Sequence, residues 1–393
     1  MLKVEQLYND LKDNGMDPIK VFVSDLKGLY QLEEESQQRL KLMLIADAFR
    51  FHYENNDFYR KQCMEKGVSP EQINNFEDIN RIPLIPVSLF KSPDSHKLLT
   101  KSLIHIEHEM RSTGTSGIPS ISRRCGDTLD NAVIAIYAMY REFFKLSKGA
   151  GLCLCPSTEE IPEMGMIKAF TFLSGLLDCH AFMVSNDRFI PEQAVEQLAK
   201  WQNKFTRHII GPPFLIHRFI SFLKATNTKL TLEPDSLVIT LGGWKRFTGQ
   251  MISRKAFNEE CAEYLGIAPE NVRDMYGLVE ANMLVIEDEF QIKHVPPYVH
   301  FSVRDPNDLT KEVAPGKTGQ LVIFDPLARS TPGMILTEDM VHLVPEVSPS
   351  GRTGQRIQYV MRAPNAKEFG CCAVNLEQKM NADEEVACPL VEA

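Results

Sequence analysis

A run of hydroxyl and glycine residues, RSTGTSGIPS at 111–120, is the segment whose residue types best suit chemistry. Its two glycines allow a tight turn that brings backbone N–H groups close to an anion. Hydroxyl side chains add donors for phosphate oxygens. The run is not a Walker P-loop, because no Gly-Lys-Ser/Thr follows it. It predicts a phosphate-binding loop, although an ordinary polar loop has the same composition.

Two later segments place acidic side chains beside an aromatic ring or strand-like residues. In DMYGLVEAN (274–282), a Tyr-Gly step precedes Glu280, so the ring can lie against a base and the carboxylate can bind a metal ion. A strand end with a solvent-facing Glu280 would have the same pattern. LTEDMVHL (336–343) places Asp339 among apolar residues, where its ionised form needs partners such as ribose hydroxyls or an arginine.

The elements that must position these segments begin with helices. Apolar residues recur at helical spacing across Glu35–Tyr53, and roughly the first 60 residues are predicted to be helical. In IPLIPVSLFK (82–91), the two prolines favour an extended segment. Between about 130 and 241, short apolar runs alternate with helical patterns, which predicts a wound α/β architecture with parallel strands. The expected helices are 131–146, 164–177, 191–205 and 214–223, and the expected strands are 151–156, 181–184, 208–210 and 237–241.

The pattern changes after about residue 285. Three strand-like runs, at 299–305, 319–325 and 334–344, are separated by Gly/Pro turns. SPSGRTG (348–354) gathers Ser, Pro and Gly, places Arg352 between two glycines, and is the best linker candidate. The roughly 40 residues that follow are too few for an independent core. We therefore expect a large domain over 1–350 and a short segment over 351–393.

Composition narrows the class of protein. The 393 residues include 43 Lys and Arg against 52 Asp and Glu, a formal charge of −9, which argues against nucleic acid as the main partner. The longest clear apolar run, 132–140, is far shorter than the roughly 20 residues that span a membrane. The charged start, MLKVEQLYND, does not resemble a signal peptide, so we expect a cytoplasmic protein. Nine cysteines without a CxxC pair indicate reduced thiols rather than a zinc site.

Taken together, the order and spacing of these segments resemble the adenylate-forming, acyl-CoA synthetase-like superfamily. The shared features are the hydroxyl/Gly loop, a Gly-Gly element in LGGWKRF (241–247), Tyr-Gly-x-x-Glu, the Asp of a Thr-x-Asp strand and Gly-Arg at the hinge. Within that superfamily the chain is similar to the LuxE-type acyl-protein synthetases over about residues 38–376. That similarity is carried by STGTSG (112–117), GGWK (242–245), VEAN (279–282), EDEFQIKHVPP (287–297), TEDMV (337–341) and CAVNL (372–376).

The resemblance implies an adenylate-forming α/β fold with wound mixed sheets and an abbreviated C-terminal segment. It also implies ATP and Mg²⁺ as cofactors and an acyl-adenylate as the first product. Glu280 would bind Mg²⁺, Asp339 the ribose hydroxyls, and Arg352 the ribose or phosphate. The phosphates would be held by Thr113, Gly114, Thr115, Ser116 and Gly117, and the adenine and acyl side would be lined by Gly242, Gly243 and Tyr276.

In LuxE-type enzymes the acyl group, from a long-chain fatty acid, then passes to the protein's own C-terminal cysteine as a thioester. Cys372 fits the family pattern better than its neighbour Cys371. The partners implied are the fatty acid reductase subunit and the acyl-transferase (thioesterase) subunit of a bioluminescence-type complex, which makes aldehyde. Two adjacent cysteines that simply pack in a core are the alternative reading of the residues alone.

The sequence departs from the superfamily in one respect. Ordinary members carry a C-terminal domain of over a hundred residues whose lysine reaches the adenylation site, whereas the segment here is short. Its two lysines, Lys367 and Lys379, lack the usual Gly-Lys context, which leaves Lys245, Arg246 and His294 as candidates for contacting the pyrophosphate.

Two other functions stay open at this point. The chain could transfer another carboxylic acid to coenzyme A or to a carrier protein, with no role for Cys372. It could also be a scaffold subunit with an adenylate-forming fold and no activity. Glu280, Asp339 and Arg352 all occur in their motif contexts, which argues against an inactive copy.

Overall fold

The computed structural model describes residues 2–112, 119–242 and 252–364. They form two compact units. The first holds residues 2–110, 120–143 and 277–364, and the second holds 111–112, 119, 144–242 and 252–276. The sequence predicted another division of the chain, into a large domain over 1–350 and a short segment over 351–393. That division stays a prediction.

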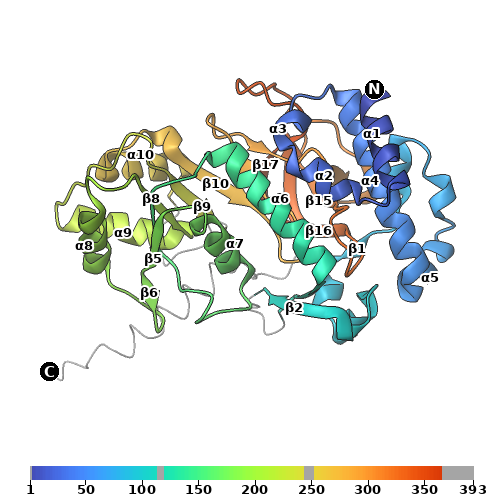
Figure 1. Cartoon of the computed structure of the whole chain (residues 1–393), viewed down its shortest axis with the longest axis horizontal. Helices are drawn as coiled ribbons and strands as arrows, with labels where there is room; N and C mark the ends of the chain where they lie inside the picture. The colour runs from blue at the N-terminus through green and yellow to red at the C-terminus, as the bar shows by residue number, and fades with distance from the viewer. Residues whose placement is uncertain (1, 113–118, 243–251, 365–393) are drawn as a thin grey trace. The chain divides into compact units, whose positions relative to one another are not determined.

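The first unit begins with the expected helices (Figure 1). They are α1 (Leu2–Asp13), α2 (Pro18–Ser24), α3 (Leu26–Leu29), α4 (Glu34–Asn55) and α5 (Asp57–Glu65), and α6 (Gly126–Phe144) follows later in the chain. Helix α4 confirms the prediction for 35–53. Its first turn carries Glu34 and Glu35, which suit the positive end of the helix dipole.

Short 3₁₀ helices connect α5 to the strands of the first unit. They are η1 (Pro70–Gln72), η2 (Phe76–Arg81), η3 (Val87–Lys91), η4 (Pro93–Leu98) and η5 (Leu103–His105). The extended conformation predicted for 82–91 is therefore wrong from Val87 onward. Pro86 caps η3 instead of preventing it, because a residue before the first turn needs no free N–H group.

The sheet of the first unit is antiparallel in the order β14-β13-β15-β16-β17-β12-β11, and β1 adds in parallel to β16. Its strands are β1 (Ile85–Pro86), β11 (Val285–Glu287), β12 (Lys293–His294), β13 (His300–Asp305), β14 (Asp308–Glu312), β15 (Gly319–Phe324), β16 (Met334–Leu343) and β17 (Arg356–Arg362). A separate ribbon pairs β2 (Ile106–Arg111) with β3 (Ile121–Cys125). The three strands predicted after 285 are confirmed as β13, β15 and β16.

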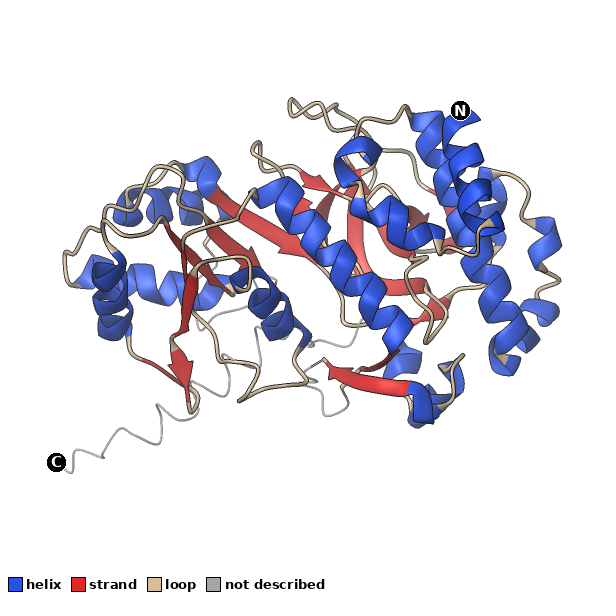
Figure 2. Cartoon of the chain, viewed as in Figure 1, coloured by secondary structure: helices blue, strands red, loops and turns tan. Residues whose placement is uncertain are grey.

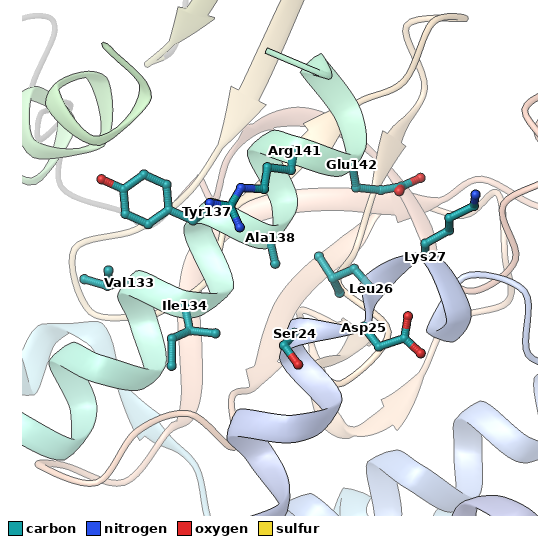
Figure 3. A pocket seen from close by; sticks show the side chains of 10 residues that line it. All are labelled: Ser24, Asp25, Leu26, Lys27, Val133, Ile134, Tyr137, Ala138, Arg141 and Glu142. Atoms are coloured by element: carbon teal, nitrogen blue, oxygen red, sulfur yellow. The ribbon is translucent and has the colours of Figure 1, made fainter. Parts of the chain in front are cut away.

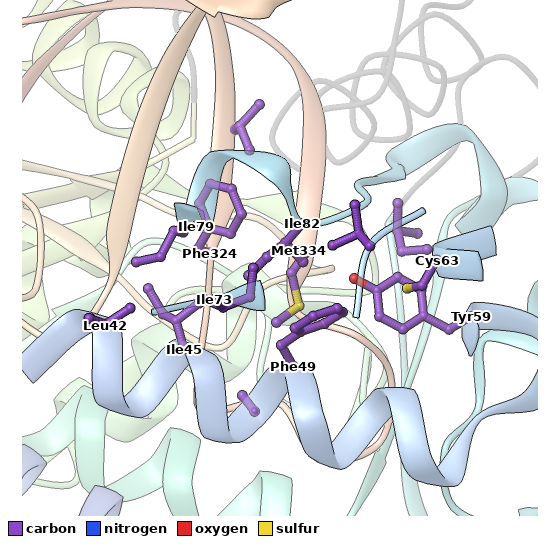
Figure 4. Packing of buried hydrophobic residues seen from close by; sticks show 14 of the residues in the cluster. Leu42, Ile45, Phe49, Tyr59, Cys63, Ile73, Ile79, Ile82, Phe324 and Met334 are labelled. Atoms are coloured by element: carbon purple, nitrogen blue, oxygen red, sulfur yellow. The ribbon is translucent and has the colours of Figure 1, made fainter. Parts of the chain in front are cut away.

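One apolar cluster joins α4 and α5 to this sheet (Figure 4). Phe49 of α4 and Tyr59 of α5 are fully buried and stack edge to face. Phe324 of β15 and Met334 of β16 bring the sheet into the same cluster. Burying each such side chain contributes roughly 1.5–3 kcal/mol to stability. The cluster therefore holds α4 and α5 against β15 and β16.

The second unit contains the predicted parallel sheet. Its order is β10-β9-β8-β4-β5, with every neighbour parallel. The strands are β4 (Ala150–Cys153), β5 (Cys179–Phe182), β8 (Arg207–Gly211), β9 (Val238–Leu241) and β10 (Val272–Tyr276), with a hairpin of β6 (Val184–Ser185) and β7 (Arg188–Phe189). The helices are α7 (Gly165–Ser174), α8 (Pro191–Trp201), α9 (Pro213–Ala225) and α10 (Arg254–Leu265), followed by η6 (Pro269–Asn271). The alternation predicted for 130–241 is confirmed, and Figure 2 distinguishes its helices from its strands.

Candidate functional site

Glu280 belongs to a group of charged residues of the first unit, the Glu280 cluster, whose other members are Asp339, Glu338, Lys91, Arg124 and Arg362. Its carboxyl group is buried and accepts a hydrogen bond from Ser120. Burial raises the pKa of Glu280, and the nearby charge of Asp339 raises it further, whereas Ser120 and the ammonium of Lys91 lower it. The charge of Asp339, the predicted ribose ligand, therefore acts on Glu280, the predicted metal ligand, although 58 residues of sequence lie between them.

The hydroxyl-rich loop begins and ends next to described residues. Ser112 and Ser120 flank it and are both buried, and the hydrogen bond from Ser120 to Glu280 links its C-terminal flank to the acidic cluster. Thr113, Gly114, Thr115, Ser116 and Gly117 lie outside the described residues.

Arg124 on β3 fixes the backbone on both sides of Glu280. Its Nη2 atom donates to the carbonyl of Val279 at 3.1 Å and to that of Ala281 at 2.8 Å. Burial lowers the pKa of Arg124 to about 10, while the charges of Asp325 and Glu280 oppose that change. Because a buried guanidinium holds both flanking carbonyls, the Glu280 side chain emerges from a restrained turn.

Asp325 fixes the next residue of the same turn. One of its carboxylate oxygens, Oδ2, accepts from the backbone N–H of Asn282 at 2.7 Å and from the side-chain amide of Asn282 at 3.1 Å. Its other oxygen accepts from the N–H of Leu327 at 2.9 Å. Burial raises the pKa of Asp325, and these hydrogen bonds and Arg124 lower it. Neither Arg124 nor Asp325 was predicted from the sequence as a site residue.

Asp339 lies on β16, opposite Arg362 of β17 in the strand register, and is 7% exposed. Its N–H group donates to the hydroxyl of Thr337 at 3.1 Å, and that hydroxyl donates to the carbonyl of Leu321 at 2.8 Å. The Thr of the Thr-x-Asp pattern thus orients the backbone from which Asp339 projects.

Glu338 accepts from two cations in the same cluster. Lys91 lies 3.2 Å from its Oε2 atom, and Arg362 donates to the same oxygen. The cluster therefore combines three carboxylates with two partly exposed cations and the buried Arg124.

The predicted residues of the second unit lie together at one end of its sheet. Tyr276 ends β10 and Gly242 follows β9, and the pairing of Leu241 with Met275 puts them at the same level. Gly242 has a φ of +102°, which favours glycine. Ligands of parallel α/β sheets bind beyond the carboxyl ends of the strands, which is where both residues lie. Gly243, Lys245 and Arg246 lie outside the described residues.

The chain matches the model of a known protein family. The family model described as acyl-protein synthetase, LuxE, matches residues 19–381. The chain belongs to this family. It is therefore a ligase of the acyl-protein synthetase type, and the resemblance seen in the sequence is confirmed.

Two relatives of this LuxE-family chain are named long-chain-fatty-acid–luciferin-component ligases. The one from Aliivibrio fischeri is 30% identical over 343 residues, which cover 86% of this chain and 88% of that protein. The one from Vibrio harveyi is 28% identical over 370 residues, which cover 89% and 91%.

The solved structures establish the fold class. An open conformation of 2-hydroxyisobutyryl-CoA ligase, in complex with 2-HIB-AMP and CoA, matches with a TM-score of 0.63 at 16% identity, covering 86% of this chain and 78% of that one. The same ligase in a postadenylation state matches at 0.63 and 15% identity, covering 89% and 73%. The predicted α/β fold of the adenylate-forming type is confirmed.

Arg352 of this LuxE-family chain has partners other than the Glu280 cluster. Its guanidinium donates to Glu142 of α6 at 2.8 Å and to Glu289 at 3.0 Å, and it lies 4.8 Å from the ring centre of Phe143. Burial lowers the pKa of Arg352, but the two carboxylates outweigh it and raise the pKa above its ordinary value. The structure thus pairs Arg352, which was predicted to contact the ribose or phosphate, with two carboxylates, one of which belongs to α6.

The residues around Arg352 also anchor the predicted linker to the first unit. The hydroxyl of Ser348 donates to Asp288, and that of Thr353 reaches the carbonyls of Tyr30 and Leu32 at 2.7 and 2.8 Å. Asp288 is itself 2.8 Å from Nε2 of His294, and both side chains are fully buried. His294 is therefore not available to a pyrophosphate.

A pocket of about 410 Å³ lies beside the same helix (Figure 3). Residues 24–27 form one wall, and residues of α6 between Val133 and Glu142 form the other. Glu142 lines the pocket and also accepts a hydrogen bond from Arg352. None of these lining residues was predicted as functional.

Cys371, Cys372, Lys367 and Lys379 lie outside the described residues. No helix in residues 2–112, 119–242 and 252–364 is long and apolar enough to cross a membrane.

Proposed function

We propose that the protein uses ATP and Mg²⁺ to activate a long-chain fatty acid as an acyl-adenylate and then transfers the acyl group to its own Cys372. The observation that carries this proposal is the LuxE family match over residues 19–381, a range that includes Cys372. The names of the relatives in Aliivibrio and Vibrio suggest the long-chain acid.

The Glu280 cluster suits a hydrated divalent cation bound to phosphates. Mg²⁺ is usually held by one or two protein carboxylates together with substrate phosphates, rather than by a full set of protein ligands. Glu280, a buried carboxylate with no role in holding the fold assigned to it, matches the case of a single protein carboxylate. When bound, the cation would offset phosphate charge and favour the ionised form of Glu280.

The first half-reaction brings two anions together. A carboxylate oxygen of the acid forms a bond to the α-phosphorus of ATP, and the bond from that phosphorus to the bridging oxygen breaks, so pyrophosphate leaves with the electron pair. Fixed donors lower the barrier to such a step because they oppose the charge where it develops. Asp339 is assigned to the ribose hydroxyls, and residues 113–117 to the phosphates.

In the second half-reaction the Cys372 sulfur attacks the acyl carbon, and AMP leaves with the electrons of the carbon–oxygen bond. The thiol loses its proton to solvent, and the product is a thioester. As the family resemblance implies, the acyl group would then be delivered to a fatty acid reductase subunit that makes aldehyde, in an oligomeric complex with an acyl-transferase subunit. A cytoplasmic location is part of the same proposal.

The alternative acceptor is coenzyme A or a carrier protein, which the fold shared with a CoA ligase favours. Labelled myristate, ATP and Mg²⁺ distinguish the two acceptors. We expect label on the protein that survives denaturation, is released by neutral hydroxylamine and is absent from Cys372→Ser. The matched control Cys371→Ser should keep it. Absence of label from wild-type protein, with label found on added coenzyme A instead, would refute self-acylation and support the alternative.

A further inference from the structure

Lys91 is a cation in the Glu280 cluster to which the proposed reaction has so far given no role. It ends η3, which contacts both β3 and β16. Its ammonium lies 3.2 Å from Oε2 of Glu338, and its charge also acts on the carboxyl of Glu280. The side chain is 24% exposed, so a solute can reach it.

Glu338 does not depend on Lys91 for a counter-charge. Arg362 donates to the same Oε2 atom from β17, the strand next to Glu338 in the sheet. If the ammonium of Lys91 turned toward another anion, the Glu338 carboxylate would keep one ion pair. Lys91 can thus change partners without leaving the Glu338 carboxylate unpaired.

The other cations of the cluster are already committed. Arg124 is buried and holds the carbonyls of Val279 and Ala281, so its movement would release the turn that carries Glu280. Arg362 is needed by Glu338. Among the described cations of this cluster, Lys91 is the one whose side chain is partly exposed, whose charge acts on Glu280 and whose helix packs on β3, the strand that follows Ser120.

We propose that Lys91 binds phosphate oxygens of ATP beside Glu280 and stabilises the charge that develops on the departing pyrophosphate. This assignment rests on the adenylation reaction proposed above. As the bond from the α-phosphorus to the bridging oxygen breaks, the electron pair moves onto pyrophosphate, and the ammonium donates a hydrogen bond to that group without giving up its proton. A positioned cation acts most strongly where charge appears during the reaction.

Myristate-dependent exchange of labelled pyrophosphate into ATP tests the assignment in the full-length protein. We expect Lys91→Met to lower the exchange rate on the order of 10²-fold, as the loss of one preorganised donor does, and Lys91→Arg to restore most of it. The control is Lys12→Met on α1, which also removes a lysine paired with a carboxylate, Asp47 at 2.6 Å. It should exchange at the wild-type rate.

Two further measurements separate a phosphate contact from a merely structural ion pair. A myristoyl sulfamoyl-adenosine analogue has no pyrophosphate, so its dissociation constant should be the same for Lys91→Met and wild type, while that of Mg·ATP should rise. Glu338→Gln breaks the ion pair but keeps the ammonium, and its exchange should fall about fivefold or less. Should Lys91→Met not fold, Lys91→Gln carries the same comparison.

The outcomes are distinct. Wild-type exchange by a folded Lys91→Met would overturn the assignment of Lys91 alone. Equal losses in Lys91→Met and Glu338→Gln, with weaker analogue binding in both, would also overturn it, because Lys91 would then only support β16. Absence of acid-dependent exchange in the wild-type protein would instead overturn the proposed function, and this assignment with it.

Discussion

Replacement of Lys41 by methionine is expected to remove a pH dependence of stability between pH 7 and pH 9. Lys41 is on α4, is 3% exposed, and donates to Oε1 of Gln355 at 3.0 Å. Burial lowers the pKa of Lys41 from 10.5 to about 7, and the charge of Glu34 offsets only part of that effect. The neighbouring His300 adds no second positive charge above pH 7, since burial and the Lys41 charge lower the pKa of His300 to about 3.

The size of the effect follows from the two pKa values. Between pH 7 and 10.5 the unfolded chain binds more protons at this lysine than the folded protein does, so the free energy of unfolding rises with pH. Below pH 7 both states are protonated and the penalty is constant, at roughly 4–5 kcal/mol for a pKa difference of about 3.5 units. About 2 kcal/mol of that penalty is relieved between pH 7 and pH 9.

Urea denaturation followed by circular dichroism at pH 7, 8 and 9 measures this change. The wild type should gain about 2 kcal/mol relative to Lys41→Met over that range, because the titration of all other groups cancels in the difference. Lys61→Met on α5 is the control, since that lysine is exposed and should give a pH-independent difference. A Lys41→Met difference that is equally flat would refute the view that Lys41 is buried with a lowered pKa.

The remaining predictions concern the acidic turn and one glycine. Glu280→Gln should lower myristate-dependent pyrophosphate exchange on the order of 10²-fold and raise the Mg²⁺ concentration needed; exchange at the wild-type rate would contradict the assignment of Mg²⁺ to this residue. Arg124→Met should lower the free energy of unfolding by about 3 kcal/mol or more, because it removes the guanidinium that holds two carbonyls and the positive charge that acts on buried Asp325, and an unchanged urea midpoint would be inconsistent with that role. Gly354→Ala should destabilise by more than the roughly 1–2 kcal/mol of a left-handed alanine, since φ is +93° and the new Cβ would lie 2.6 Å from Oε1 of Gln37. Gly316→Ala, with φ of +81° and open space around it, is the matched control in the same denaturation assay, and equal losses would show that the Gln37 contact does not matter.

The sequence by itself determined the elements and the chemical segments. Helix α4, the alternation from α6 to β9 and the strands β13, β15 and β16 are confirmed, because local periodicity decides whether an apolar face can be buried by a helix or by a strand. The motifs also singled out Glu280 and Asp339, and in the fold the charge of Asp339 acts on Glu280, but their roles stay predictions. The roles given to residues 113–117 and to Cys372 stay predictions.

Only the tertiary structure decided which side chains surround those motifs. Arg124 reaches a carbonyl 155 positions away, and Lys91 reaches a carboxylate 247 positions away. No local pattern marks either residue, and Lys91 lies in a segment predicted to be extended. Ion pairs and buried hydrogen bonds are set by which strands become neighbours, and that order depends on burying the sheet against α4 and α5, a property of the whole chain rather than of any window of it.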